Sequence, residues 1–376
     1  MNYVEVETTK EFLDILPSRK KFEHFAFQNI DFSSITNEIK DIGFSNCLFL
    51  GCKFNSTDLV RLISDNDIFP NLELPYNQYP AKLYTKASLY TSYKTGNPSS
   101  YKQTYDFKVY DHFIRTGKES ASISEELARR IHDHAITDAL YDFLSGYDER
   151  RVVAIMGGHD LSRKSDDFLK VSLLSKLLCE KGYLMVSGGG PGAMEATHLG
   201  SWFAGRPESD LKEALKILCK APEYQNEFWL DTALSVIEKY PHQSGFESLG
   251  IPTWLYGHEP STPFATKIAK YFANSIREDG LLTIAKGGLI FTPGSAGTLQ
   301  EIFQDATQNH YLVFGYSSPM IFYGKHFWMN EVPVFQFLSD LLKRNKYKNL
   351  LISIHDEVNE LVEVIDRFSG IIIPEA

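Results

Sequence analysis

The sequence lacks the features that mark disulfide-rich, metal-thiolate and membrane proteins. Four cysteines in 376 residues are too few for a disulfide scaffold, and no C-x-x-C pair provides a zinc or redox motif. No stretch of about 18 consecutive apolar residues occurs. The first residues also lack the basic and apolar regions of a signal peptide. We therefore expect a cytoplasmic protein with reduced thiols and no membrane contact.

The sequence also lacks a long run of basic residues. It has 38 Lys and Arg against 48 Asp and Glu, so its formal net charge is −10. A net acidic chain without a basic stripe repels a phosphate backbone, which makes nucleic acid an improbable partner. Its hydrophobic content of 43% is close to the globular average, and the length suits two domains at about 150 residues each.

Phenylalanines recur at intervals of five in the first region, residues 1–74. Phe22, Phe27 and Phe32 form one series, and Phe44, Phe49 and Phe54 form a second. Neither a helix nor a strand has this period, and a short pentapeptide-repeat-like solenoid does. A few short strands with a Phe-rich buried face are the alternative. In both interpretations the two cysteines within the second series, Cys47 and Cys52, are packing residues.

Residues 75–150 are predicted to form a tyrosine-rich connector followed by a helix. The connector has no clean periodicity, and its tyrosines either clamp it onto a neighbouring part of the protein or stack against a base. Ser122 and Glu125 have the spacing of a capping box, which predicts that a helix begins there.

Residues 151–376 alternate between short apolar runs and helical patterns, which predicts an α/β fold with a doubly wound, Rossmann-like parallel sheet. The expected strands are 152–156, 183–186, 253–256, 288–291, 320–323 and 350–353. Ligands of such sheets bind beyond the carboxyl ends of the strands. Glycine clusters follow three of these runs, so a binding site is expected at that edge.

Two of these clusters have the composition of anion-binding turns. Residues 187–195 read Ser-Gly-Gly-Gly-Pro-Gly-Ala-Met-Glu, and residues 293–301 read Pro-Gly-Ser-Ala-Gly-Thr-Leu-Gln-Glu. Each lies where a strand meets a helix, so backbone N–H groups and the helix dipole can face a phosphate. The chain has no P-loop, no G-x-S-x-G nucleophile elbow and only a weak dinucleotide fingerprint.

Together these turns resemble the signature of the LONELY GUY family, long mislabelled as lysine decarboxylases. That family has a G-G-G-x-x-G-x-M turn and, about a hundred residues later, P-G-G-x-G-T-x-x-E. The fourth glycine is shifted by one position here, as in the longer bacterial nucleotide 5′-monophosphate nucleosidase branch, and Gly157-Gly158-His159 also looks like that branch. The resemblance covers about residues 152–368.

The resemblance implies a hydrolase that cleaves the N-glycosidic bond of a nucleoside 5′-monophosphate to free base and ribose 5-phosphate. It assigns the catalytic carboxylate to Glu301, whose other interpretation is a helix-end residue that favours the dipole. It assigns a phosphate-clamping or Glu301-orienting role to Arg277, if one residue is inserted before Pro293. Glu278 is then about 100° round the helix and is expected to face away. Substrate binding is expected from Gly157, Gly158, His159, Gly188, Gly189, Gly190, Gly192, Met194, Glu195, Gly294, Ser295, Gly297 and Thr298.

Three of these residues have a second interpretation. Ser295 replaces a family glycine and narrows the pocket or donates to phosphate. Glu195 would disfavour a nearby phosphate and suits a ribose hydroxyl, and His159 contacts substrate or caps a strand end.

No cofactor and no metal are expected, because the chain has no His/Asp cluster at ligand spacing. The resemblance also suggests a homodimer or a larger homo-oligomer. The alternative function is a non-catalytic carrier or sensor of a nucleotide or nucleotide-derived ligand, including a molybdenum cofactor. Binding alone requires neither Glu301 nor Arg277.

Overall fold

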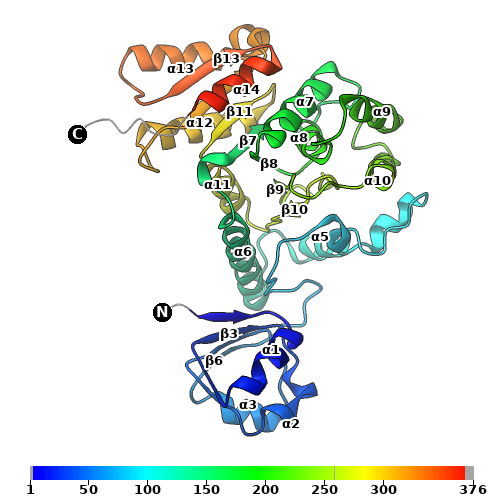
Figure 1. The fold of residues 1–376 in the computed structure, drawn as a ribbon, viewed down its shortest axis with the longest axis vertical. Coiled ribbons are helices and arrows are strands. Elements are labelled where there is room, and N and C mark those ends of the chain that lie inside the picture. The colour runs from blue at the N-terminus through cyan, green and yellow to red at the C-terminus, as the bar shows by residue number, and fades with distance from the viewer. Residues whose placement is uncertain (1–2, 258, 369–376) are drawn as a thin grey trace. The chain divides into compact units, whose positions relative to one another are not determined.

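The computed structural model describes residues 3–257 and 259–368 of the chain (Figure 1). It contains two compact units. Unit 1 comprises the residues up to Leu83 together with Asp111–Tyr141, and unit 2 comprises Tyr84–Tyr110 together with the residues from Asp142 onward. Helices α5 (Tyr105–Thr116) and α6 (Ile123–Leu144) each continue from one unit into the other.

Unit 2 is built on a parallel sheet with the strand order β10-β9-β8-β7-β11-β12-β13. Its strands are β7 (Val152–Met156), β8 (Leu184–Ser187), β9 (Ser248–Gly250), β10 (Lys267–Ile268), β11 (Gly288–Phe291), β12 (Pro319–Tyr323) and β13 (Leu351–His355). Every pairing in it is parallel. The predicted doubly wound α/β fold is therefore confirmed. The strand order reverses between β7 and β11, and ligands of such sheets bind at this switch point.

Helices cover both faces of this sheet. Besides α5 and α6, the helices in the described part of unit 2 are α4 (Lys86–Leu89), α7 (Asp166–Glu180), α8 (Ala193–Trp202), α9 (Glu208–Leu218), α10 (Trp229–Lys239), α11 (Asn274–Ile284), α12 (Ala296–His310), α13 (Val334–Lys343) and α14 (Val358–Arg367), with short helical turns at Pro98–Gln103, Glu149–Arg151 and Phe327–Glu331. Helices α7, α8 and α14 share a core with Ile321 of β12. The next residue, Phe322, points to the opposite face and contacts Phe335 of α13.

One sequence expectation in unit 2 is wrong. Residues 253–256 form no strand: the strand lies earlier, at Ser248–Gly250, and Trp254 is buried instead against Phe272. Strand β10 follows at Lys267–Ile268, and α11 begins at Asn274. The segment between β9 and β10 is thus an irregular loop over the carboxyl end of the sheet.

The tyrosine-rich residues 84–110 pack onto unit 2 through a buried polar network. The Asp106 carboxylate accepts hydrogen bonds from Lys270 (2.6 Å), from the indole N–H of Trp254 (2.9 Å) and from the Tyr101 hydroxyl (3.2 Å). Lys270 and Asp106 are 1% and 2% exposed. A buried ion pair needs such extra hydrogen bonds to offset its desolvation. The connector therefore holds Trp254 and Lys270 in place, as the clamping interpretation expects.

Unit 1 has short parallel strands around a phenylalanine core. Its strands are β1 (Val4–Val6), β2 (Lys21–Glu23), β3 (Phe25–Gln28), β4 (Gly43–Ser45), β5 (Leu48–Leu50) and β6 (Asp67–Phe69), and its helices are α1 (Thr9–Ile15), α2 (Thr36–Ile39) and α3 (Ser56–Leu62), with helical turns at Leu16–Ser18 and Phe32–Ser34. The two series lie side by side, with Phe22 paired to Phe44 and Phe27 to Phe49. Helices α2 and α3 interrupt the five-residue period, so short strands with a buried Phe face describe the unit. Cys47 and Cys52 are buried in this core.

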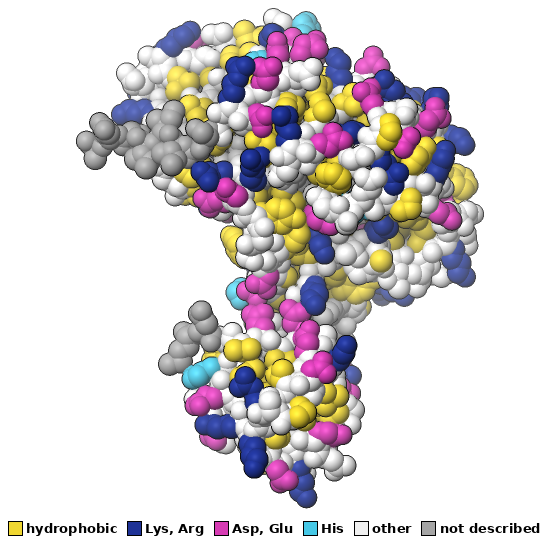
Figure 2. Space-filling model, viewed as in Figure 1, with side chains coloured by type: hydrophobic (Ala, Val, Ile, Leu, Met, Phe, Trp, Pro, Cys, Tyr) yellow, Lys and Arg dark blue, Asp and Glu magenta, His cyan; other side chains and the backbone are white. Residues whose placement is uncertain are grey.

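The surface agrees with the mixed charge of the sequence. On the face shown in Figure 2, basic and acidic side chains are interspersed and neither forms a large patch. Within residues 3–257 and 259–368, no helix combines the length and the apolar character needed to cross a bilayer.

Candidate functional site

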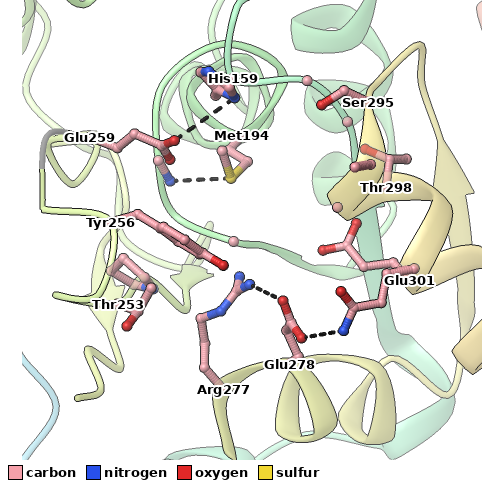
Figure 3. Close-up of a pocket in the computed structure, with 18 residues that line it drawn as sticks. His159, Met194, Thr253, Tyr256, Glu259, Arg277, Glu278, Ser295, Thr298 and Glu301 are labelled. Carbon is pink, nitrogen blue, oxygen red and sulfur yellow. Dashed lines mark hydrogen bonds and ion pairs between the residues drawn. The ribbon is translucent and has the colours of Figure 1, made fainter. Parts of the chain in front are cut away.

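A pocket of about 370 Å³ lies at the carboxyl ends of β7, β8 and β11, which is the switch point of the sheet. It is lined by Gly157, Gly158, His159, Gly188, Gly190, Met194, Pro252, Thr253, Tyr256, Glu259, Arg277, Glu278, Ser295, Ala296, Gly297, Thr298, Gln300 and Glu301. Both predicted glycine turns and both predicted catalytic residues therefore contribute to one pocket (Figure 3).

The N-terminus of α12 presents open hydrogen-bond donors to this pocket. Ser295 precedes the helix and its side chain makes no capping hydrogen bond. Among the described residues, the amides of Ala296, Gly297 and Thr298 have no hydrogen-bond partner. Free first-turn amides and the positive end of the helix dipole bind anions. This turn can accept a phosphate without breaking any bond of the protein.

The first glycine turn differs in that the protein already uses several of its donors. The Gly189 amide donates to Ser187 Oγ (3.1 Å), and the Ala193 amide donates to the Gly158 carbonyl (3.1 Å). The Gly190 amide points at Met194 Sδ, 3.4 Å away. The turn at α12 thus leaves its first three amides open, whereas the first glycine turn uses part of its donors within the protein.

The glycines of the first turn are required by close contacts. At Gly189 and Gly192 φ is +70°, a conformation that residues with a Cβ rarely adopt. A Cβ on Gly192 would also lie 2.4 Å from the Gly158 carbonyl oxygen. Gly189, Gly192 and Gly294 do not line the pocket. They allow the backbone conformation of the two turns whose other residues line it.

Arg277 reaches the pocket from α11 and is held there by hydrogen bonds. Its Nε donates to Asn274 Oδ1 (3.0 Å), and its Nη2 donates to Glu278 Oε1 (3.1 Å). Glu278 also accepts from Asn274 (2.8 Å) and from Gln300 of α12 (2.7 Å). The expectation that Glu278 faces away is therefore wrong: its long side chain folds back toward Arg277 and lines the pocket.

Glu301 lies on α12, one turn after Thr298, and points into the space that Arg277 faces (Figure 3). Burial raises the pKa of its carboxyl to about 7, with Arg277 lowering the pKa and Glu278 raising it. A carboxyl with such a pKa exchanges protons near neutral pH, which a catalytic acid or base requires.

His159 follows β7 at the far side of the pocket. Its ring contacts Asp160 (3.0 Å) and Glu259 (3.8 Å), and it meets the Tyr224 ring edge to face at 5.8 Å. Glu259 and Tyr256 come from the loop after β9, which the sequence analysis assigned in part to a strand. Tyr256 and Glu259 were not predicted as site residues because of this wrong strand. If the strand had been placed with its end at Gly250, the loop after it would have been expected at the binding edge of the sheet.

Glu195 lies outside the pocket, contrary to its expected role near a ribose. Its carboxylate is fully buried and accepts two hydrogen bonds from Arg163, one from Nε at 2.9 Å and one from Nη2. Arg163 Nη1 donates to the carbonyls of Ala221 and Trp229 and to the hydroxyl of Thr232. Glu195 therefore anchors the loop that carries His159.

A methyl group at Gly188 is expected to disturb the site more than the fold. Its Cβ would lie 2.7 Å from Met194 Sδ and 3.2 Å from Arg277 Nη1, and both are ends of flexible side chains. Gly188→Ala should shift thermal unfolding little and should weaken binding of a ligand in this pocket, as measured by calorimetry.

Gly280→Ala on α11 is the matched control, because its Cβ meets nothing within 4 Å. It should stabilise the helix by up to about 1 kcal/mol and leave binding unchanged. Equal binding by both alanine variants would contradict the placement of Arg277 against Gly188.

No protein-family model matches this sequence, and no curated protein matches it. Three solved structures are similar to 57% of this chain: the molybdenum cofactor binding protein of Rippkaea orientalis (15% identity, 94% of that chain, TM-score 0.37), the molybdenum cofactor carrier protein of Chlamydomonas reinhardtii (13%, 96%, 0.36) and the protein TM1055 (19%, 98%, 0.35). At these identities and TM-scores, the function has to be inferred from the side chains of this chain.

Proposed function

We propose that this protein hydrolyses the N-glycosidic bond of a nucleoside 5′-monophosphate. The observation that supports this most is the position of Glu301, whose carboxyl lies one helical turn behind the open N-terminus of α12 and shares a pocket with Arg277. One helix then provides both an anion site and a carboxylate at a fixed spacing.

The spacing suits a sugar phosphate. At a rise of about 1.5 Å per residue, the Cα of Glu301 is about 7.5 Å further along the helix axis than the Cα of Ala296. Helical side chains lean toward the N-terminus, which brings the carboxyl of Glu301 closer to a bound phosphate than its Cα. A ribose fits between these two positions, with its anomeric carbon toward Glu301.

The charge of Glu301 fits the bond that would break. Cleavage of an N-glycosidic bond develops positive charge on the ribosyl ring, and a carboxylate next to the ring stabilises it. A carboxylate whose pKa is about 7 can also accept the proton of the attacking water. The products are the free base and ribose 5-phosphate.

Arg277 is better suited to orient Glu301 than to clamp the phosphate. Glu278 already neutralises its guanidinium, and the pocket contains Glu259 and Glu301 as further carboxyl groups. These acids would repel a phosphate bound beside Arg277. The α12 amides have no such anionic partner, so a phosphate is better bound there. Arg277 therefore supports the charge of Glu301 and can contact the ribose.

The alternative is a carrier that binds a nucleotide or a nucleotide-derived ligand without cleaving it. A carrier requires the α12 amides, but it gains nothing from a buried carboxyl with a raised pKa. An amino-acid decarboxylase using pyridoxal phosphate would need a lysine in the pocket. None of the described residues that line it is a lysine.

We expect nucleoside 5′-monophosphates to be cleaved at least about a hundredfold faster, as kcat/KM, than the matching nucleosides, because phosphate binding at α12 positions the ribose. Parallel assays of each pair, followed by chromatography of the free base, measure this ratio. Equal turnover of nucleotide and nucleoside would contradict a phosphate site at α12.

A further inference from the structure

Glu278 is the centre of a hydrogen-bond network between α11 and α12. One carboxylate oxygen accepts from Asn274 at 2.8 Å and from Arg277 at 3.1 Å, and the other accepts from Gln300 at 2.7 Å. The side chain is 12% exposed and lines the pocket. All three partners are donors, so Glu278 acts as the acceptor of the whole network.

The next residue of α11 makes a similar bridge without a connection to the pocket. Asp279 accepts a hydrogen bond from Gln304 of α12. Neither Asp279 nor Gln304 lines the pocket, and Asp279 is exposed. Two carboxylate–glutamine bridges thus join the same two helices, but only the first one contacts Arg277. A role in helix packing alone would apply to both.

We propose that Glu278 is a positioning residue of this site, which fixes the guanidinium of Arg277 and sets the charge that surrounds Glu301. Its effect on turnover rests on the proposed function. Its effect on the charge around Glu301 concerns the empty pocket and can be measured without any substrate.

The geometry gives Glu278 two effects on its neighbours. It occupies Arg277 Nη2 while Asn274 occupies Nε, so the guanidinium cannot rotate and Nη1 stays against Gly188. Its negative charge also opposes ionisation of Glu301 and so contributes to the raised pKa of that carboxyl.

No other ionisable group described near Glu301 provides the same negative charge as Glu278. Arg277 is the nearby cation on α11, and His159 and Glu259 belong to the loops across the pocket. On α12 itself Asp305 is one turn further along, and burial raises the pKa of its carboxyl well above the usual value, which favours the neutral form. Glu278 is therefore the anion whose removal should change Glu301.

The test compares Glu278→Gln with Asp279→Asn, two changes that remove one negative charge each from the same interface. The full-length ligand-free proteins carry glutamate labelled with ¹³C at the carboxyl, and the Glu301 signal is assigned by its loss in Glu301→Gln. In Glu278→Gln the Glu301 carboxyl should titrate about one pH unit lower than in the parent. In Asp279→Asn it should titrate as in the parent.

The second measurement is the pH dependence of nucleotide cleavage. The acid limb of the rate profile should move down by the same amount in Glu278→Gln, while Asp279→Asn keeps the parent profile. An unchanged Glu301 titration in Glu278→Gln, or an equal shift in both variants, would overturn the role of Glu278. If the parent cleaves no nucleotide, the proposed function fails, and the titration alone still decides whether Glu278 controls Glu301.

Discussion

Glu301→Gln should lose about a hundredfold or more in turnover while keeping most of its affinity for the nucleotide. The change keeps the shape of the side chain and removes the charge that stabilises a developing ribosyl cation. The parent should also slow as the pH falls through about 7, since burial raises the pKa of Glu301 to that value. Initial rates from pH 5.5 to 9 and calorimetric affinities for the same nucleotide measure both effects.

A second measurement on this variant requires no catalysis. A carboxyl whose pKa is raised in the folded state destabilises the fold as the pH rises from about 4.5 to about 7. Glu301→Gln removes this cost, so the variant should exceed the parent in unfolding free energy at pH 8, by a gain on the order of 3 kcal/mol. At pH 4 the two proteins should be equal. A parent-like rate at pH 8 would reduce Glu301 to a helix-end residue.

Arg163→Met should lower the stability of the fold by about 3–5 kcal/mol, because it leaves Glu195 buried without its partner. Both side chains of this ion pair are 1% exposed, and Arg163 also lies 4.6 Å from the centre of the Trp229 ring. Urea denaturation followed by tryptophan fluorescence should show a clear fall in the midpoint.

Two variants separate this effect from a general loss of arginine. Arg150→Met breaks an ion pair whose side chains are 44% and 45% exposed, so the midpoint should not move. Arg163→Met combined with Glu195→Leu removes both charges and should recover part of the loss. A midpoint for Arg163→Met equal to that of Arg150→Met would show that the buried pair does not anchor the loop.

The fold of unit 2 could be predicted because its strands are short apolar runs separated by helical patterns. The strands at Val152–Met156 and Gly288–Phe291 lie as expected. Strand β9 was missed because Ser248–Gly250 contains one large apolar residue. The aromatic run that follows it is buried for another reason: Trp254 packs on Phe272 and donates to Asp106, contacts that depend on distant parts of the chain.

The site could be predicted where its residues follow strands in the sequence. It could not be predicted where a side chain contacts a residue of another segment or folds back to a neighbour. The glycine turns were found from their own residues, whereas Glu301 and Arg277 were found from the family resemblance, which for Arg277 required a one-residue insertion. Helical geometry placed Glu278 about 100° away from Arg277, but it does not describe how a flexible side chain folds back to a neighbour. Similarly, no local pattern shows that Glu195 is buried against Arg163, thirty-two positions earlier.

The most direct measurement of the central claim is the fate of a bound nucleotide. Purified protein is incubated with each common nucleoside 5′-monophosphate, and the base and ribose 5-phosphate are quantified by chromatography, with Glu301→Gln in parallel. The proposed function predicts that the parent releases the two products in equal amounts over many turnovers and that Glu301→Gln releases almost none. A nucleotide that binds with measurable affinity and is recovered intact from the parent would contradict it and identify the protein as a carrier.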